Sequence, residues 1–287
     1  MDQIGFLERI SKAFPPLLAE IAAPPEGLFY KGSFPPEGRC ATIAIVGTRR
    51  ATPEGRRIAR DFARDLARSG CAIVSGLAFG IDRAAHEGCL AANAPTIAVL
   101  AGGLHAVYPR EHDRLAEEIL ASGGALVSEY PPGELPYPAR FLERNRLIAG
   151  LAHATVIIEA PLGSGSLRTA REALDANREV FVVPGAIRDQ NYAGSHELIK
   201  KGAALVTSAE DILEALGVER RHISRPETRA LSPEERAIMN ALSKSRAPSD
   251  IDKIATITRL EPRNVNRTIS FLIAKDLIRE EGGKYTI

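Results

Sequence analysis

The chain has 287 residues, of which 45% are hydrophobic and 25% charged, and its formal net charge is +1. This is the composition of a globular protein, and the length allows one large domain and a smaller one. No apolar run approaches the ~20 residues of a membrane span, and the first residues lack the basic and apolar regions of a secretory signal. We therefore expect a cytoplasmic protein that does not enter a membrane.

The charge does not by itself indicate a nucleic-acid partner. Residues 228–287 carry 11 Lys and Arg against 8 Asp and Glu, so even the most basic part is only mildly positive. Any site for a polyanion must be a local patch. Cys40, Cys71 and Cys89 include no CxxC pair, and we interpret them as reduced thiols rather than as a metal site or a disulfide framework.

Residues 1–40 contain three proline pairs and predict a short helix and an extended lead-in that packs on a sheet. Residues 41–216 then alternate short apolar runs with helical patterns, which predicts a doubly wound α/β domain with a mostly parallel sheet. The predicted strands are Thr42–Val46, Ala72–Val74, Thr96–Leu100, Ala125–Val127, Thr155–Ile158, Val180–Val183 and Ala204–Val206.

The clearest helix lies between the first two strands. Thr52 can cap it, Pro53 takes its first position, Ile58, Phe62 and Leu66 form its apolar face, and Gly70 ends it. Further helical patterns lie near 110–121, 140–151, 166–177, 195–201 and 208–216.

A polar linker at 217–230 separates a second domain, 231–287. Ser232 and Glu235 form a capping box around Pro233, so a helix begins there. Helical patterns follow near 250–256 and 261–274, and the terminal stretch predicts a hairpin that turns at Gly282-Gly283. This order is typical of a small winged helix-turn-helix domain. Arg263, Asn264, Asn266 and Arg267 lie where duplex readers place base contacts, but a protein-interaction module fits equally well.

Small and basic residues follow the strands of the large domain. They are Gly47-Thr48-Arg49-Arg50, Ser75–Gly80, Ala101-Gly102-Gly103 and Gly163-Ser164-Gly165-Ser166. Ligands of open α/β sheets bind outside the carboxyl ends of the strands, where backbone N–H groups and helix N-termini can hold phosphate. Four such loops favour phosphate binding over simple tight turns. The chain has neither a GxGxxG nor a GxxxxGK[ST] motif, so a dinucleotide site and a P-loop ATPase are not expected.

The segment Tyr137–Arg146 places three arginines and an asparagine around Phe141, with one acid among them. Cations beside an aromatic platform are typical of single-strand binders. The alternative is an ordinary helix start, with Phe141 in the core and the arginines solvated. Asp82 and His86, at i and i+4, fit a surface ion pair or packing at a strand-to-helix junction better than catalysis or a metal. Arg56, Arg57, Arg60 and Arg64 are interpreted as a solvated helix face.

These motifs together resemble the DNA-processing protein A (DprA/Smf) family over about residues 14–216. The matching stretches are Ser75–Asp82 with Ala85-His86, Gly103-Leu104, Tyr108-Pro109, Ser128–Pro131, Phe141 with Arg144–Leu151, Ser164–Leu167, Val180–Gly185, and Leu198-Ile199 with Gly202-Ala203. The sequence departs from the family pattern at Leu142, Arg168 and His196. We expect the helical domain that precedes the lead-in in many members to be absent or reduced to residues 1–13.

The resemblance implies an extended Rossmann-like domain that dimerises and binds single-stranded DNA in a basic pocket. It implies the recombinase RecA as a partner, roles in natural transformation and recombination, and no catalysis, cofactor or metal. The residues expected to contact DNA are Gly47, Arg49, Arg140, Phe141, Arg144, Asn145, Arg146, Ser164, Gly165, Ser166 and Arg168.

An enzymatic alternative remains open. Phosphoribohydrolases that release bases from nucleoside monophosphates share this type of sheet and carry a PGGxGTxxE motif. Pro161–Ser166 and Thr169–Glu172 echo that motif, but the Gly-Thr pair and its spacing to the glutamate differ.

Overall fold

The computed structural model describes residues 3–34, 41–218, 232–244, 248–274, 277–281 and 283–286. The chain forms two compact units, Met1–Ile223 and Ser224–Ile287, and each is described by itself. The predicted linker falls almost entirely on residues 219–231, and Cys40 on 35–40, outside the described residues. Within the described ranges, no helix combines the length and apolar character that crossing a bilayer would require.

The first unit is built on a nine-stranded sheet with the order β1-β2-β6-β5-β4-β3-β7-β8-β9. Seven strands run parallel to one another, and their bounds are β3 Thr42–Val46, β4 Ala72–Ser75, β5 Thr96–Val99, β6 Ala125–Ser128, β7 Ala154–Ile157, β8 Glu179–Val182 and β9 Ala204–Leu205. The doubly wound α/β prediction is confirmed, and each predicted strand lies within a residue or two of the observed one.

The direction of strand addition reverses between β3 and β7. From β3 the chain adds β4, β5 and β6 on one side of the sheet, and β7, β8 and β9 then extend it on the other side. Such a reversal opens a crevice at the carboxyl ends of the two neighbouring strands, because their connections leave toward opposite faces. The fold therefore places its natural ligand site beyond Val46 and Ile157.

The lead-in contains the predicted short helix, and its extended segments join the sheet as strands. It forms two strands, β1 (Gly5–Glu8) and β2 (Gly27–Gly32), which pair antiparallel around the one-turn helix α1 (Pro16–Ala19). Strand β2 also pairs antiparallel with β6, with Phe29 opposite Ser128. Neither strand is continuously buried, so both lack the uninterrupted apolar run that identified the parallel strands in the sequence.

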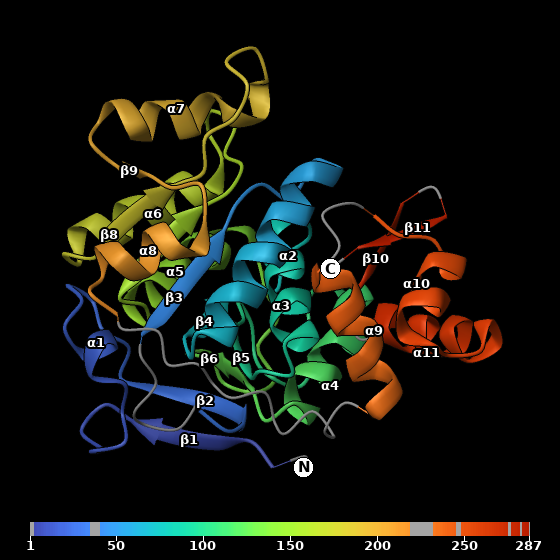
Figure 1. Cartoon of the computed structure of the whole chain (residues 1–287). Helices are drawn as coiled ribbons and strands as arrows, with labels where there is room; N and C mark the ends of the chain where they lie inside the picture. The colour runs from blue at the N-terminus through green and yellow to red at the C-terminus, as the bar shows by residue number, and fades with distance from the viewer. Residues whose placement is uncertain are drawn as a thin grey trace. The chain divides into compact units, whose positions relative to one another are not determined.

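Helices cover both faces of the sheet (Figure 1). On one face, α2 (Pro53–Arg68), α3 (Ile81–Ala91) and α8 (Ala209–Ala215) pack on side chains such as Ile43, Ile73 and Phe181. On the other face, α5 (Pro138–Gly150) and α6 (Gly165–Asp175) pack on Val46 and Val182. The remaining helices of this unit are α4 (Asp113–Ala121) and α7 (Ala193–Lys200), with 3₁₀ turns at Arg110–His112 and Gln190–Tyr192.

Helix α2 forms as its sequence predicts. The Thr52 side chain accepts a hydrogen bond from the Gly55 amide, Pro53 occupies the first turn, and Phe62 and Leu66 are buried. The cap satisfies one of the amides that a helix N-terminus leaves unpaired.

The second unit contains α9 (Pro233–Lys244), α10 (Ile251–Thr258) and α11 (Pro262–Ala274), followed by an antiparallel pair, β10 (Arg279–Glu281) and β11 (Lys284–Thr286). It has its own core, which includes Ile238, Ile254 and Leu272. The capping box forms, because the Glu235 amide donates to Ser232 and the Ser232 amide donates back to the Glu235 carboxylate. The order of elements is the predicted one, while its assignment as a winged helix-turn-helix stays a prediction.

Candidate functional site

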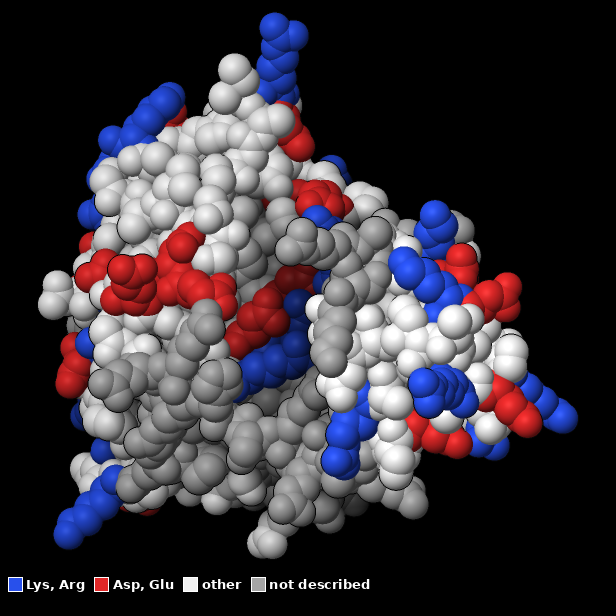
Figure 2. Space-filling view, viewed as in Figure 1, with Lys and Arg blue, Asp and Glu red and all other residues white. Residues whose placement is uncertain are grey.

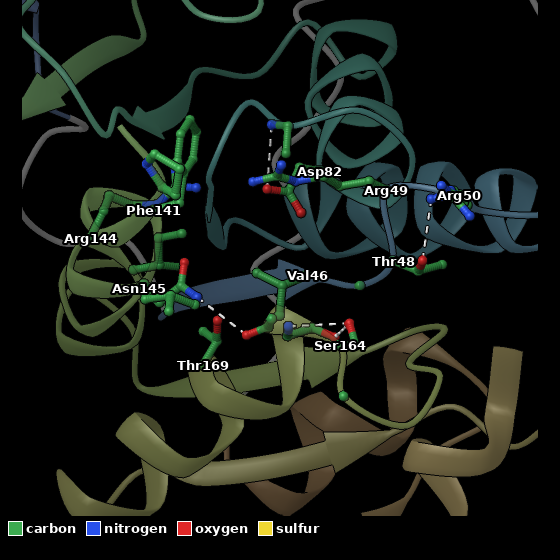
Figure 3. A pocket seen from close by; sticks show the side chains of 18 of the residues that line it. Val46, Thr48, Arg49, Arg50, Asp82, Phe141, Arg144, Asn145, Ser164 and Thr169 are labelled. Atoms are coloured by element: carbon green, nitrogen blue, oxygen red, sulfur yellow. Dashed lines mark hydrogen bonds between the residues drawn. The ribbon is translucent and has the colours of Figure 1, made fainter. Parts of the chain in front are cut away.

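A pocket of about 700 Å³ opens at the carboxyl ends of β3 and β7, where the strand order reverses. Its walls come from the loop after β3, the first two turns of α5, and the loop that leads into α6 (Figure 3). The described residues that line it are Val46–Arg50, Ala78, Asp82, Tyr108, Pro136–Pro138, Phe141, Leu142, Arg144, Asn145, Ile148, Pro161–Ser166 and Thr169.

Hydrogen bonds of the loop after β3 fix the backbone that carries Arg49. The Thr48 amide donates to the Glu159 carbonyl at 2.7 Å, and the Arg50 amide donates to the Thr48 hydroxyl at 3.2 Å. A Cβ atom at Gly47 would lie 2.5 Å from the Ile81 side chain, so close packing requires glycine there. The loop projects Arg49 across the pocket toward Phe141 (Figure 3). In the part of the chain that the structure describes, no carboxylate forms an ion pair with Arg49.

The opposite wall is the N-terminus of α6. Ser164 caps this helix, because its hydroxyl accepts from the Ser166 amide and lies 2.7 Å from the Ser166 hydroxyl. No atom lies within 4 Å of the position that a Cβ of Gly165 would occupy, so the backbone there is open to a ligand. Amides at a helix N-terminus and the helix dipole favour an anion, and this wall can therefore hold a phosphate.

Helix α5 provides the aromatic and amide groups. The half-buried ring of Phe141 packs edge-on against Tyr108 at a centroid distance of 5.5 Å and lies 4.9 Å from Cζ of Arg49. Phe141 belongs to none of the buried core clusters of the unit. Asn145 donates to the Gly165 carbonyl at 3.2 Å and joins α5 to the α6 wall. One face of the Phe141 ring thus borders the pocket beside a cation.

Arg144 and Asp82 form the floor, and both are buried. Nη1 of Arg144 donates to the Gly76 carbonyl at 2.7 Å and to the Val99 carbonyl, and Asp82 Oδ2 accepts from the Gly76 amide at 3.0 Å. Burial lowers the pKa of Arg144 to about 10 despite the nearby carboxylate of Asp82. Burial likewise raises the pKa of Asp82, against the opposing charge of Arg144. Because the Arg144 guanidinium group is buried, it holds the loops after β4 and β5 together through these hydrogen bonds and has little contact with solvent.

The structure brings eight of the eleven predicted contact residues together around this pocket: Gly47, Arg49, Phe141, Arg144, Asn145, Ser164, Gly165 and Ser166. The three others, all arginines, do not line it. Arg140 is stacked between Tyr130 and Tyr137 and pairs with Glu134 at 2.8 Å. Arg146 pairs with Glu129, and Arg168 pairs with Glu172 at 3.3 Å along α6.

Fifteen of the described lining residues were not among the predicted contacts, and they include Arg50, Tyr108, Tyr137 and Thr169. Arg50 and Tyr137 lie inside segments that the sequence analysis identified. Within those segments, Arg49 and Phe141 were predicted as DNA contacts and these two residues were not. Tyr108 belongs to the loop after β5, and the position of that strand in the sheet brings the residue near Phe141.

The interpretation of Asp82 and His86 as packing at a strand-to-helix junction is confirmed. His86 is buried, and its Nδ1 lies 3.0 Å from the Thr96 hydroxyl. Nδ1 of the buried His112 lies 2.8 Å from the Leu77 carbonyl. Among the described residues, no group of three His, Cys, Asp or Glu is placed to hold a metal ion.

The positive character of the pocket is local. Arg49, Arg50 and Arg144 face one lining carboxylate, Asp82, which the Gly76 amide engages. Elsewhere, Lys and Arg side chains lie scattered among Asp and Glu over the face drawn in Figure 2. Fold and pocket together define an α/β protein with a Rossmann-like sheet. Its site is suited to a ligand that carries both a chain of phosphate groups and aromatic rings.

Comparison with known proteins places this chain in one family. The family model of DNA recombination-mediator protein A matches residues 5–217, and the chain belongs to that family. It is 46% identical over 206 residues to Protein Smf of Escherichia coli, covering 72% of this chain and 55% of that protein. It is 42% identical over 253 residues to the putative DNA processing protein DprA of Mycobacterium tuberculosis, covering 85% and 64%.

Two solved structures are similar over about three quarters of the chain. The X-ray structure of DprA from Streptococcus pneumoniae has a TM-score of 0.68 at 39% identity and covers 74% of each chain. A structure of DprA from Helicobacter pylori, described for its single-stranded DNA binding mode, has a TM-score of 0.67 at 32% identity and covers 75% of this chain and 95% of that one. The chain spans only 55% and 64% of the length of the E. coli and M. tuberculosis relatives.

Proposed function

We propose that the pocket binds single-stranded DNA and that the protein delivers the strand to the recombinase RecA in transformation and recombination. The observation that carries this proposal is the position of Arg49, which forms no ion pair with a carboxylate among the described residues, over the ring of Phe141 where it borders the pocket. A nucleotide offers a phosphate to the first group and a base to the second. The binding mode described for the H. pylori relative supports the same assignment.

The two walls of the pocket suit the repeating chemistry of a strand. Arg49 and Arg50 on one side, and the open N-terminal turn of α6 at Gly165 on the other, are suitable partners for phosphate groups. Phe141 and Tyr108 are the stacking partners. A duplex keeps its base faces covered by neighbouring pairs, so only a single strand can use the aromatic wall. The proposal therefore includes preference for single strands with little sequence selectivity.

Transfer to RecA and action as a homodimer are the finer parts of the proposal. They rest on membership of the recombination-mediator family, and they would locate the protein in the cytoplasm, where the recombinase and the DNA are. Binding without base readout suits a mediator, because it must accept any incoming sequence and release it again.

The decisive measurement is fluorescence anisotropy with single-stranded and duplex oligonucleotides of equal length at two salt concentrations. We expect tighter binding of the single strand, with a log–log salt slope of about −0.7 for each phosphate neutralised. Equal affinity for both forms, or a flat salt response, contradicts the proposal.

A separate assay tests transfer: the protein should shorten the lag before RecA assembles on DNA that carries a single-strand-binding protein.

A phosphoribohydrolase function has less support. Glu172, which echoes the catalytic glutamate of that motif, is not one of the residues that line the pocket, and it pairs with Arg168. The one carboxylate among the described lining residues, Asp82, is engaged by backbone amides. Incubation with nucleoside monophosphates, followed by chromatography for free base, tests this alternative.

A further inference from the structure

A second hollow of about 430 Å³ adjoins the pocket where α2 faces the start of α3. We call it the α2–α3 hollow. Its lining residues are Arg49, Arg56, Arg60, Phe79, Gly80, Arg83, Ala84 and Glu87. Arg49 lines the pocket as well, so the two cavities share a wall. A ligand that passes Arg49 can therefore reach both.

The α2–α3 hollow is positively charged. Four arginines line it against a single carboxylate, that of Glu87. Glu87 accepts from Arg60 at 2.7 Å and from Arg83 at 2.7 Å, so one negative charge is shared between two guanidinium groups. Arg56 donates to the Ala51 carbonyl at 2.6 Å and, within the described ranges, has no carboxylate partner. The excess of cations suits a phosphate backbone.

The hollow also has an aromatic wall. Phe79 is 40% exposed, although it follows a buried strand and precedes a buried helix turn. Its ring packs edge-on against His112, with 4.8 Å between the centroids, and His112 is itself anchored to the Leu77 carbonyl. The ring is thus held in place with one face open beside the arginines. An exposed aromatic ring among cations is the arrangement on which single-strand binders stack bases.

The pocket and the α2–α3 hollow each combine arginines with an aromatic ring, and Arg49 lines both. Phe141 is the ring of the first and Phe79 the ring of the second. The sequence suggested that the arginines of α2 form one solvated face, but the structure divides them. Arg56 and Arg60 line the hollow, whereas Arg57 pairs with Glu54 and Arg64 with Asp61.

We infer that the single strand continues from the pocket, past Arg49, into the α2–α3 hollow. There Phe79 stacks on a further base, and Arg60 and Arg83 contact the phosphates beside it. Glu87 positions these two arginines. This inference rests on the proposed function and extends the DNA path by a second binding site.

The test is an anisotropy titration with labelled oligothymidylates of increasing length. Wild-type affinity should rise in a step once the strand is long enough to reach the hollow. Phe79→Ala should reduce affinity for the long strands about tenfold, the effect of one lost stack, and leave the shortest bound strand unaffected. Phe79→Tyr, which can still stack, should restore the step. Arg83→Ala should reduce the salt slope on long strands by about 0.7.

Arg57→Ala is the matched control, since Arg57 lies on the same helix outside the hollow and its side chain is well exposed. It should bind every length like the wild type. The inference is overturned if Phe79→Ala and Arg83→Ala keep the wild-type length dependence while short strands still bind. It is also overturned if Phe79→Ala loses affinity at every length together with melting temperature, which would make Phe79 structural. If the wild type binds no single strand at all, the proposed function fails first.

Discussion

The guanidinium carbon of Arg49 lies 4.9 Å from the centroid of the Phe141 ring, although one residue follows β3 and the other begins α5. A cation over an aromatic face is attracted by about 0.5–1 kcal/mol at an exposed site. The contact holds the Arg49 side chain across the pocket and leaves its N–H groups for a phosphate. It also couples the phosphate contact to the ring on which a base would stack.

Arg49→Ala should weaken the binding of all single strands alike and reduce the log–log salt slope by about 0.7, because one phosphate contact is lost. Stability should change little, since the side chain is exposed. Arg114→Ala is the control: Arg114 is 90% exposed and pairs along α4 with Glu118. Normal binding by an Arg49→Ala protein that melts several degrees lower would instead make Arg49 structural.

Phe141→Ala separates stacking from packing. If the ring stacks on a base, the variant should lose about 1–3 kcal/mol of DNA affinity with little loss of stability. A core phenylalanine would cost about 3–5 kcal/mol of folding free energy instead. The half-buried ring, outside the core clusters, favours the first outcome. A denaturant melt beside an anisotropy titration of the same variant decides, and a large stability loss with unchanged affinity would exclude the stacking role.

Arg144 and Asp82 should behave as a coupled pair. Arg144→Met removes a charge that acts on the buried Asp82 carboxylate together with hydrogen bonds to two buried carbonyls, and leaving such acceptors unsatisfied typically costs about 1–3 kcal/mol. Asp82→Asn should also destabilise, because the Arg144 charge then stays buried alone. A double-mutant cycle measured by urea unfolding should give a coupling of about 0.5–3 kcal/mol. Additive effects would show that each residue acts only through its backbone hydrogen bonds.

Stability should fall with acid because of His86. Burial lowers the pKa of His86 to about 3, and the charges of His112 and Arg144 act in the same direction. Its unfolded value is about 6.5, so between pH 6.5 and 3 the unfolded chain binds a proton that the folded chain does not. The free energy of unfolding therefore drops as pH falls through this window, by up to about 1.4 kcal/mol per pH unit.

Urea unfolding at pH 7 and pH 5 measures this effect. His86→Leu should lower stability at pH 7 and show a smaller decrease between the two pH values than the wild type. His105→Leu, at an exposed position, should keep the wild-type decrease. An unchanged pH dependence in His86→Leu would assign the acid sensitivity to other groups.

Residues 1–218 should fold alone and retain most single-strand binding. The described residues that line the pocket all belong to the first unit, and the second unit has a separate core. The measurement compares the shortened protein with the full chain in thermal melting and in anisotropy. Insolubility or loss of binding would make the C-terminal unit part of the site.

The parallel strands, and the edge of the sheet at which the pocket opens, were predictable from the sequence. A strand buried on both faces is a short continuous apolar run, and Thr42–Val46 and Ala125–Ser128 carry this signal without help from distant residues. The loops after parallel strands meet at one edge of the sheet, so the amino-acid sequence alone is enough to bring Arg49 and Ser164 to the same edge. Strands β1 and β2 lacked such a signal, because a half-covered edge hairpin buries only some of its residues.

The tertiary structure alone decided what each arginine does. Arg140, Arg144 and Arg146 are indistinguishable along one basic segment, yet the helix turns them in different directions. Arg140 lies between two tyrosine rings, Arg146 meets Glu129, and Arg144 is buried on the carbonyls of Gly76 and Val99. Their partners come from other loops and strands, and only the packed sheet brings those partners within reach. Local sequence therefore specified where the cations gather, and long-range contacts specified which of them remain for a ligand.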